Sequence, residues 1–175
     1  VDLQHDLFYL VYFAVTITVL AAYVRVEHVE VAKIFRNRWR WSLGLGVLLA
    51  GLLVFNVLNT EDATGRPHGA YFVFELLWRG VGYGVVDTLL LTIFPCFVAY
   101  KLLQGRVDGL KGKLRLTALM LPLVFVITAT YHWGYPQYRE DGLNRPETGN
   151  VLISIPTLAA VWLVCPTGHA FAHAS

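Results

Sequence analysis

A carboxylate and a guanidinium stand four residues apart inside an otherwise apolar stretch of the chain. Glu75 and Arg79 belong to the segment Tyr71-Phe-Val-Phe-Glu-Leu-Leu-Trp-Arg-Gly80, and the apolar run continues to Leu103. A charge inside a membrane helix costs on the order of 2.5–3.5 kcal/mol on insertion scales. Opposite charges at positions i and i+4 share one helical face and can pair. The spacing predicts an ion pair at a buried reactive or ion-handling site, with a purely structural pair between helices as the alternative.

Three histidines have side chains that fit the same chemistry. His132 stands at the end of a later apolar run, and His169 and His173 are four residues apart near the end of the chain. A carboxylate and an imidazole at one depth can form a general-base pair that takes a proton from water. The spacing of the two C-terminal histidines also fits metal ligands, and two packing histidines are the alternative. We expect Glu75, His132 and one C-terminal histidine to converge on one cavity, and we leave any metal or cofactor open.

Asp87 follows Glu75 by twelve residues in the same apolar run. Twelve steps of about 100° turn it about 120° around the helix from Glu75, and the rise places it roughly 18 Å deeper. It therefore faces a different neighbouring helix. A hydrogen bond to a Ser, Thr or Tyr on that neighbour is the favoured interpretation, and an ion pathway is the alternative.

The composition of the chain tells which kind of protein must hold these residues. Of 175 residues, 56% are hydrophobic and 15% are charged, and the mean hydropathy is +0.54. Soluble domains carry about 25% charged residues, so we expect an integral membrane protein with lipid as its partner. The net charge of +2 does not indicate a nucleic-acid partner. Cys96 and Cys165 stand in apolar runs, so we expect small core residues and no disulfide framework.

Apolar runs predict an all-α, polytopic transmembrane helix bundle that forms one membrane-embedded domain over residues 1–175. The third run would extend roughly 50 Å as a helix, beyond the hydrocarbon core of about 30 Å, so we expect a kink at Pro95 or a break near its glycines. The fifth run is short and contains Pro156, so we expect it to be broken or partly re-entrant. A sixth helix begins at His169, and we interpret the chain as a fragment. The five runs are 7–24, 41–58, 70–103, 116–133 and 151–165.

Basic residues are distributed unevenly among the segments between these runs. The segments 25–40 and 101–115 each hold five Lys or Arg, whereas 59–69 holds one and 135–150 holds two. The positive-inside rule then places both basic segments in the cytoplasm and the N-terminus outside. Part of the first basic segment would form an amphipathic helix on the membrane surface, with Val29, Ala32, Ile34 and Phe35 facing lipid.

The residues Glu-Leu-Leu-Trp-Arg-Gly at 75–80 resemble the first motif of the CAAX prenyl protease and bacteriocin-processing family of intramembrane proteases. That motif has two glutamates, three residues and an arginine, usually followed by glycine. The family's second motif places a phenylalanine four residues before a histidine, where this chain has Thr128 and His132. Its third motif pairs a histidine with an asparagine, where this chain has His169-Ala-Phe-Ala-His173. The resemblance covers about residues 71–175.

The resemblance implies an intramembrane endopeptidase, a hydrolase in the plasma membrane of a prokaryote that acts on a membrane-associated peptide. Glu75 and His132 would activate water in such an enzyme, and Arg79 would hold the carboxylate. His173 or His169 would stabilise the oxyanion, and His173 is the closer match to the third motif.

Two departures from the family pattern define the alternatives. Phe74 stands where the family has its first glutamate, the general base, and Thr128 replaces the phenylalanine of the second motif. One alternative is a catalytically inactive membrane scaffold or chaperone of the same fold. The other is an ion- or proton-handling transporter that uses Glu75, Arg79 and Asp87.

Overall fold

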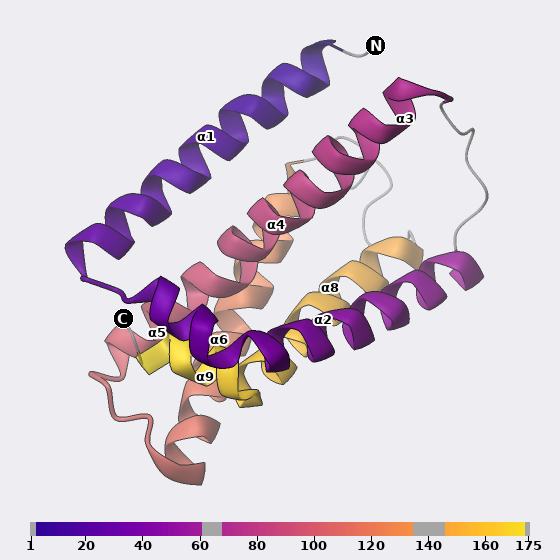
Figure 1. The fold of residues 1–175 in the computed structure, drawn as a ribbon. Coiled ribbons are helices and arrows are strands. Elements are labelled where there is room, and N and C mark those ends of the chain that lie inside the picture. Colours follow the sequence, from indigo (N-terminus) through magenta and orange to yellow (C-terminus); the bar gives the residue numbers. More distant parts are fainter. Residues whose placement is uncertain (1–2, 61–67, 135–145, 174–175) are drawn as a thin grey trace.

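Every element of secondary structure in the described part of the chain is a helix. The computed structural model describes residues 3–60, 68–134 and 146–173 (Figure 1). The predicted all-α class is confirmed for these residues. The elements in chain order are α1 (Leu3–Val26), α2 (Val31–Thr60), α3 (Ala70–Glu75), η1 (Leu76–Gly82), α4 (Tyr83–Thr88), η2 (Leu89–Ile93), α5 (Phe94–Leu102), α6 (Gly109–Trp133), α8 (Pro146–Val164) and α9 (Pro166–His173).

Four helical stretches are long and apolar enough to cross a membrane, and each overlaps one of the first four predicted runs. The fifth run lies in the shorter apolar helix Val151–Val164, which is part of α8. The four long stretches are Asp6–Val26, Val31–Asn56, Ala70–Leu102 and Gly109–Trp133.

The fifth run is not broken, which corrects that part of the expectation, and whether it crosses the membrane fully or is re-entrant stays a prediction. α8 is a 19-residue helix from Pro146 to Val164 and continues through Pro156. It begins upstream of the apolar run, at a proline, which is a residue type favoured at the first position of a helix because its fixed φ is already helical. The whole helix extends roughly 28 Å, but its apolar part, Val151–Val164, extends only about 21 Å, less than the hydrocarbon core of about 30 Å.

Residues 31–40 of the first basic segment are part of α2, not a separate helix on a surface. α2 begins at Val31 and runs without interruption to Thr60, and neither Gly nor Pro occurs between residues 31 and 43 to separate the basic residues from the apolar run. Val29 and Ile34 were expected to face lipid, but both are buried against Phe97 of α5 and Phe171 of α9. The prediction that Val29 and Ile34 face lipid is therefore wrong, because α9 packs against these side chains and buries them.

The third run stays helical from end to end, and its irregularities are two π-helical stretches, η1 and η2. Pro95 stands at the start of α5, directly after η2. Proline has no backbone N–H and its ring clashes with the carbonyl four residues back, so a wider turn before it relieves the conflict. η1 contains Gly80 and Gly82, so the predicted break near the glycines is a change of helical type within a continuous segment.

The main core lies where α5, α6 and α8 meet, as α6 packs against both of the other helices. Cys96 belongs to this core, and Cys165 is also buried; both are free thiols, as expected. The first turn of α9 lies so close to the end of α8 that residue 168 must be glycine, because a Cβ there would lie 1.9 Å from the Trp162 carbonyl oxygen. The buried members of the core are Cys96, Ala99, Val107, Leu116, Met120, Val124, Ala159 and Leu163.

The two basic segments lie at one end of the bundle. Lys101 Nζ, at the end of α5, pairs with Glu27 Oε2 in the α1–α2 turn at 2.5 Å. Figure 1 shows this turn, α5 and the C-terminal helix α9 close together, while the start of α1 and α3 lie at the opposite end. This grouping agrees with the alternation of charge, and the side of the membrane that each end faces stays a prediction.

Candidate functional site

The predicted pair between Glu75 and Arg79 is formed. Arg79 Nη1 donates to Glu75 Oε1 at 2.9 Å. Arg79 also binds Asp6 of α1, whose Oδ1 lies 3.2 Å from Nη2 and 3.4 Å from Nε. One guanidinium thus joins two carboxylates and ties the start of α1 to η1.

Asp6 was not among the residues singled out from the sequence. It could have been predicted to lie near Glu75, because it stands directly before the first apolar run and the charge alternation places it at the same end of the bundle. The three side chains of the cluster are 17–30% exposed. At this partial burial water screens the charges in part, so the contribution of the cluster to stability should lie between those of an exposed and a buried ion pair.

A second polar group lies deeper, around Asp87 in α4. Tyr12 of α1 donates its hydroxyl hydrogen to Asp87 Oδ1 at 2.7 Å, which confirms the favoured interpretation of a hydroxyl partner on a neighbouring helix. The hydroxyls of Tyr83 and Tyr131 lie 2.7 Å apart, and both also reach the Asp87 carboxylate. We call these four residues, Tyr12, Tyr83, Asp87 and Tyr131, the tyrosine network.

His132 extends this network toward the end of α6. Its Nδ1 lies 2.8 Å from the Thr128 carbonyl oxygen, and because a carbonyl only accepts, Nδ1 carries the hydrogen and Nε2 is the basic nitrogen. Its ring meets the ring of Tyr131 edge to face, with centroids 5.2 Å apart. The imidazole also lies within electrostatic range of Asp87.

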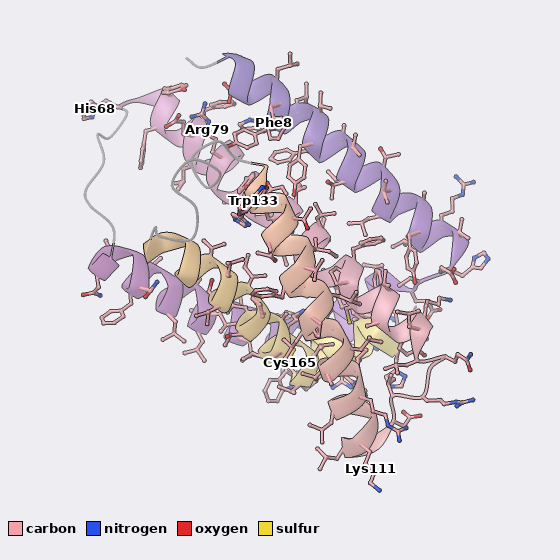
Figure 2. The ribbon with its side chains drawn as sticks, turned by 180° about the vertical axis from the view of Figure 1, so that it is seen from behind. Phe8, His68, Arg79, Lys111, Trp133 and Cys165 are labelled. Carbon is pink, nitrogen blue, oxygen red and sulfur yellow. The ribbon has the colours of Figure 1, made fainter. Side chains whose placement is uncertain are left out.

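The structure gives Glu75 and His132 different principal partners. Glu75 binds Arg79, whereas His132 binds the Thr128 carbonyl and contacts Tyr131. Figure 2 shows Arg79 and Trp133, which follows His132, in one half of the molecule. That Glu75 and His132 converge on one water molecule stays a prediction.

The two C-terminal histidines do not join that half of the molecule. His173 Nε2 lies 3.1 Å from His169 Nε2 and 3.4 Å from Asp108 Oδ1, and its ring meets that of Tyr100 at 5.8 Å. Tyr100 follows Glu75 by 25 residues on one continuous helical segment, which corresponds to roughly 35 Å. The expectation that a C-terminal histidine shares a cavity with Glu75 is therefore wrong.

The reason for this separation is the length of α8. A helix of 19 residues carries the chain back to the basic end, where the chain turns after Cys165 into α9. Figure 2 shows Cys165, which precedes this turn, in the half of the molecule opposite Arg79. Burial lowers the pKa of His169, and the nearby His173 and Lys113 lower it further. Within the described residues, no three His, Cys, Asp or Glu side chains form a group suited to a metal ion.

A cavity of about 390 Å³ lies between α2, the α4–η2 stretch and α8, and Asp87 is the charged residue in its lining. A neighbouring cavity of about 240 Å³ shares Gly46, Leu49 and Trp162 with it and continues toward Phe35 and Phe171. Sequence reasoning did not identify this space, because its walls come from three separate parts of the chain. The lining residues of the larger cavity are Gly46, Leu49, Asp87, Thr88, Leu91, Thr92, Ile155, Leu158 and Trp162.

The arrangement places one carboxylate between an apolar cavity and a set of hydroxyl and imidazole groups. Hydroxyls can donate and accept at once, and imidazole exchanges a proton near neutral pH. The chemistry that these groups can perform is therefore uptake, transfer and release of a proton. Comparison of the chain with protein-family models, with curated proteins and with solved structures found no match.

Proposed function

We propose that this chain is an integral membrane protein with five spans, and that it handles protons through Asp87. The spans would be the four long apolar stretches and α8. Membrane lipid is then the immediate partner of the exposed apolar side chains. This proposal follows the ion- or proton-handling alternative that the sequence left open.

The observation that carries the proposal is the setting of Asp87. It stands near the middle of the stretch Ala70–Leu102, where a charge is costly and usually functional. Its partners are tyrosine hydroxyls, and among the described residues no Lys or Arg pairs with it. A carboxylate held by neutral donors can gain or lose a proton without leaving a buried cation unpaired.

The tyrosine network supplies a route for that proton. From Asp87 the proton would pass through the paired hydroxyls of Tyr83 and Tyr131 toward His132, whose ring contacts that of Tyr131 near the end of α6. At each hydroxyl one hydrogen arrives as another leaves, so each tyrosine is neutral again after the transfer, and rotation of the hydroxyls about their C–O bonds restores the original direction of the hydrogen bonds. The neighbouring Trp133 is 58% exposed, so the route ends close to the surface of the protein.

The Asp6–Arg79–Glu75 cluster lies at the same end as this exit. By linking α1 to η1 it would hold Tyr12 against Asp87, since Tyr12 lies on α1 less than two turns beyond Asp6. In this function Glu75 and Arg79 act as positioning residues and Asp87 carries the proton.

The peptidase expectation has one observation in its favour and one against it. Arg79 binds Glu75, as the resemblance implies for such an enzyme. The oxyanion role, however, needs His169 or His173 near Glu75, and both lie at the opposite end of the bundle. Proton handling uses residues that are already in contact, so we favour it.

Proton movement into proteoliposomes that contain a pH-sensitive dye tests the proposal. Under an imposed membrane potential, we expect the protein to acidify or alkalise the lumen faster than protein-free liposomes. Asp87→Asn should lower the rate at least tenfold. Asp108→Asn is the control, because this carboxylate is 88% exposed and lies at the other end. A rate equal to that of empty liposomes, or one unchanged by Asp87→Asn, would overturn the proposal.

A further inference from the structure

The cavity beside Asp87 has the size and chemical character of a ligand site. Its volume of about 390 Å³ falls within the usual range for small-molecule sites of roughly 300–1,000 Å³. Gly46 contributes open space, since a Cβ there would meet nothing within 4 Å. The smaller cavity extends the apolar space along α2 from Leu49 to Phe35, a length of roughly 20 Å.

The polar groups of the lining indicate the charge of the ligand. Among the described residues of the lining, Asp87 supplies the only charge, and Thr88 already donates its hydroxyl hydrogen to the Gly84 carbonyl at 2.8 Å. Trp162 of α8 lines both cavities and offers an aromatic ring, which attracts cations. An anion would be repelled by the carboxylate, and a bare inorganic cation would gain little from apolar walls.

Access to the cavity follows from how α2 packs. Its first half contacts α9, where Ser42 Oγ donates to Thr167 Oγ1 at 3.1 Å. The apolar side chains of its second half are exposed, among them Leu52 (57%) and Phe55 (68%). In a bilayer this half of α2 would face lipid, so a ligand dissolved in the membrane could reach the cavity from the side.

We propose that the cavity between α2, η2 and α8 binds a lipophilic cation, such as an amine or quaternary ammonium with a large apolar body, with its charge on Asp87. The apolar body would lie along α2 toward Phe35 and Phe171. The inference rests on the proposed function. The lipophilic cation would be the transported ligand, and a proton on Asp87 would oppose its binding. The inference is based on the charge complementarity between the Asp87 carboxylate and a cation, and on the apolar lining of the rest of the cavity.

Equilibrium binding of tetraphenylphosphonium to the purified protein in detergent tests this assignment. Tetraphenylborate has the same shape and the opposite charge, so it separates charge recognition from simple partition into apolar space. We expect saturable binding of the cation and none of the anion. Asp87→Asn should weaken cation binding at least tenfold.

A pair of glycine variants supplies the matched control. Gly46→Leu keeps Asp87 and fills the cavity, so it should weaken binding at least tenfold. Gly44→Leu is two residues away on the same helix, also points into open space and lies outside both cavity linings, so it should leave binding unchanged. Equal binding of both ions, or binding unaffected by Gly46→Leu, would overturn the assignment.

The binding assay needs no proton gradient, so the two proposals can fail separately. Cation binding that does not depend on Asp87, together with Asp87-dependent proton movement, would reject the cargo and keep the proposed function. Asp87-dependent binding without proton movement would keep the site and reject the proposed function.

Discussion

The hydroxyl of Tyr12 donates a 2.7 Å hydrogen bond to the carboxylate of Asp87, and this bond joins the first helix to the third apolar run. The two residues are 75 positions apart, so the contact depends on how α1 lies along α4. A hydrogen bond to a charged group contributes roughly 1.5–3 kcal/mol, whereas one between neutral groups contributes about 1 kcal/mol. The strength of this bond therefore reports the protonation of Asp87.

Tyr12→Phe should lower the free energy of unfolding by about 1.5–3 kcal/mol if Asp87 is ionised, or by about 1 kcal/mol if it is protonated. A double-mutant cycle with Asp87→Asn isolates the pair from other effects of each substitution. Denaturation in detergent, followed by circular dichroism, measures all four variants. Strictly additive effects would show that the bond contributes nothing.

Arg79→Ala should destabilise the protein by about 1–3 kcal/mol, between the values for exposed and fully buried pairs. The substitution leaves Asp6 and Glu75 as like charges without the cation that joins them. Arg115→Ala is the control, because that side chain is exposed, and it should change stability little. If both variants melt at the same temperature, the cluster does not link α1 to η1.

Gly168→Ala and Gly149→Ala should have opposite effects on stability. A Cβ at 168 would lie 1.9 Å from the Trp162 carbonyl oxygen and 2.7 Å from its ring, so α9 must shift, at a cost of about 1–3 kcal/mol or more. A Cβ at 149 meets nothing within 4 Å, and alanine in a helix is favoured over glycine by roughly 0.5–1 kcal/mol. Thermal denaturation of both variants checks the prediction, and a neutral Gly168→Ala would show that the turn is looser than this.

His169 predicts how stability changes with pH. Burial lowers its pKa in the folded state, so the unfolded chain binds a proton more readily. Its contribution to stability is therefore fully present above the unfolded pKa of about 6.5 and is lost as pH falls below it. We expect the melting temperature to fall as the pH is lowered from 7.5 to 5.5, and His169 to contribute to that fall.

His169→Gln should flatten this pH dependence, while His68→Gln should not, because His68 is exposed. Melting curves at matched ionic strength compare the three proteins. A pH profile that is identical with and without His169 would assign the dependence to other groups.

Single cysteines test the predicted orientation, in a background without Cys96 and Cys165. Arg106→Cys lies in the basic end of the bundle and should resist an impermeant thiol reagent applied to intact cells. His68→Cys lies between α2 and α3, at the predicted outer end, and should react. Labelling of the first and protection of the second would reverse the orientation.

Local features of the chain were sufficient to predict the helices and the nature of two polar contacts. The spacing of Glu75 and Arg79 determines that they share a helical face, so their pair needs no other part of the protein. The rotation of about 120° around the helix axis between Glu75 and Asp87 likewise predicts that Asp87 faces another neighbouring helix. Apolar runs predict spans because backbone groups in lipid must bond within their own segment.

What the tertiary structure alone decided was which helices meet. Hydrophobicity does not select one neighbour over another among membrane helices, since lipid is as apolar as any of their faces. The choice is made by shape and by a few polar contacts, such as Asp6 with Arg79, Tyr12 with Asp87 and Ser42 with Thr167. The same packing separates the C-terminal histidines from Glu75 and opens the cavity at Asp87, because both depend on where α8 and α9 lie.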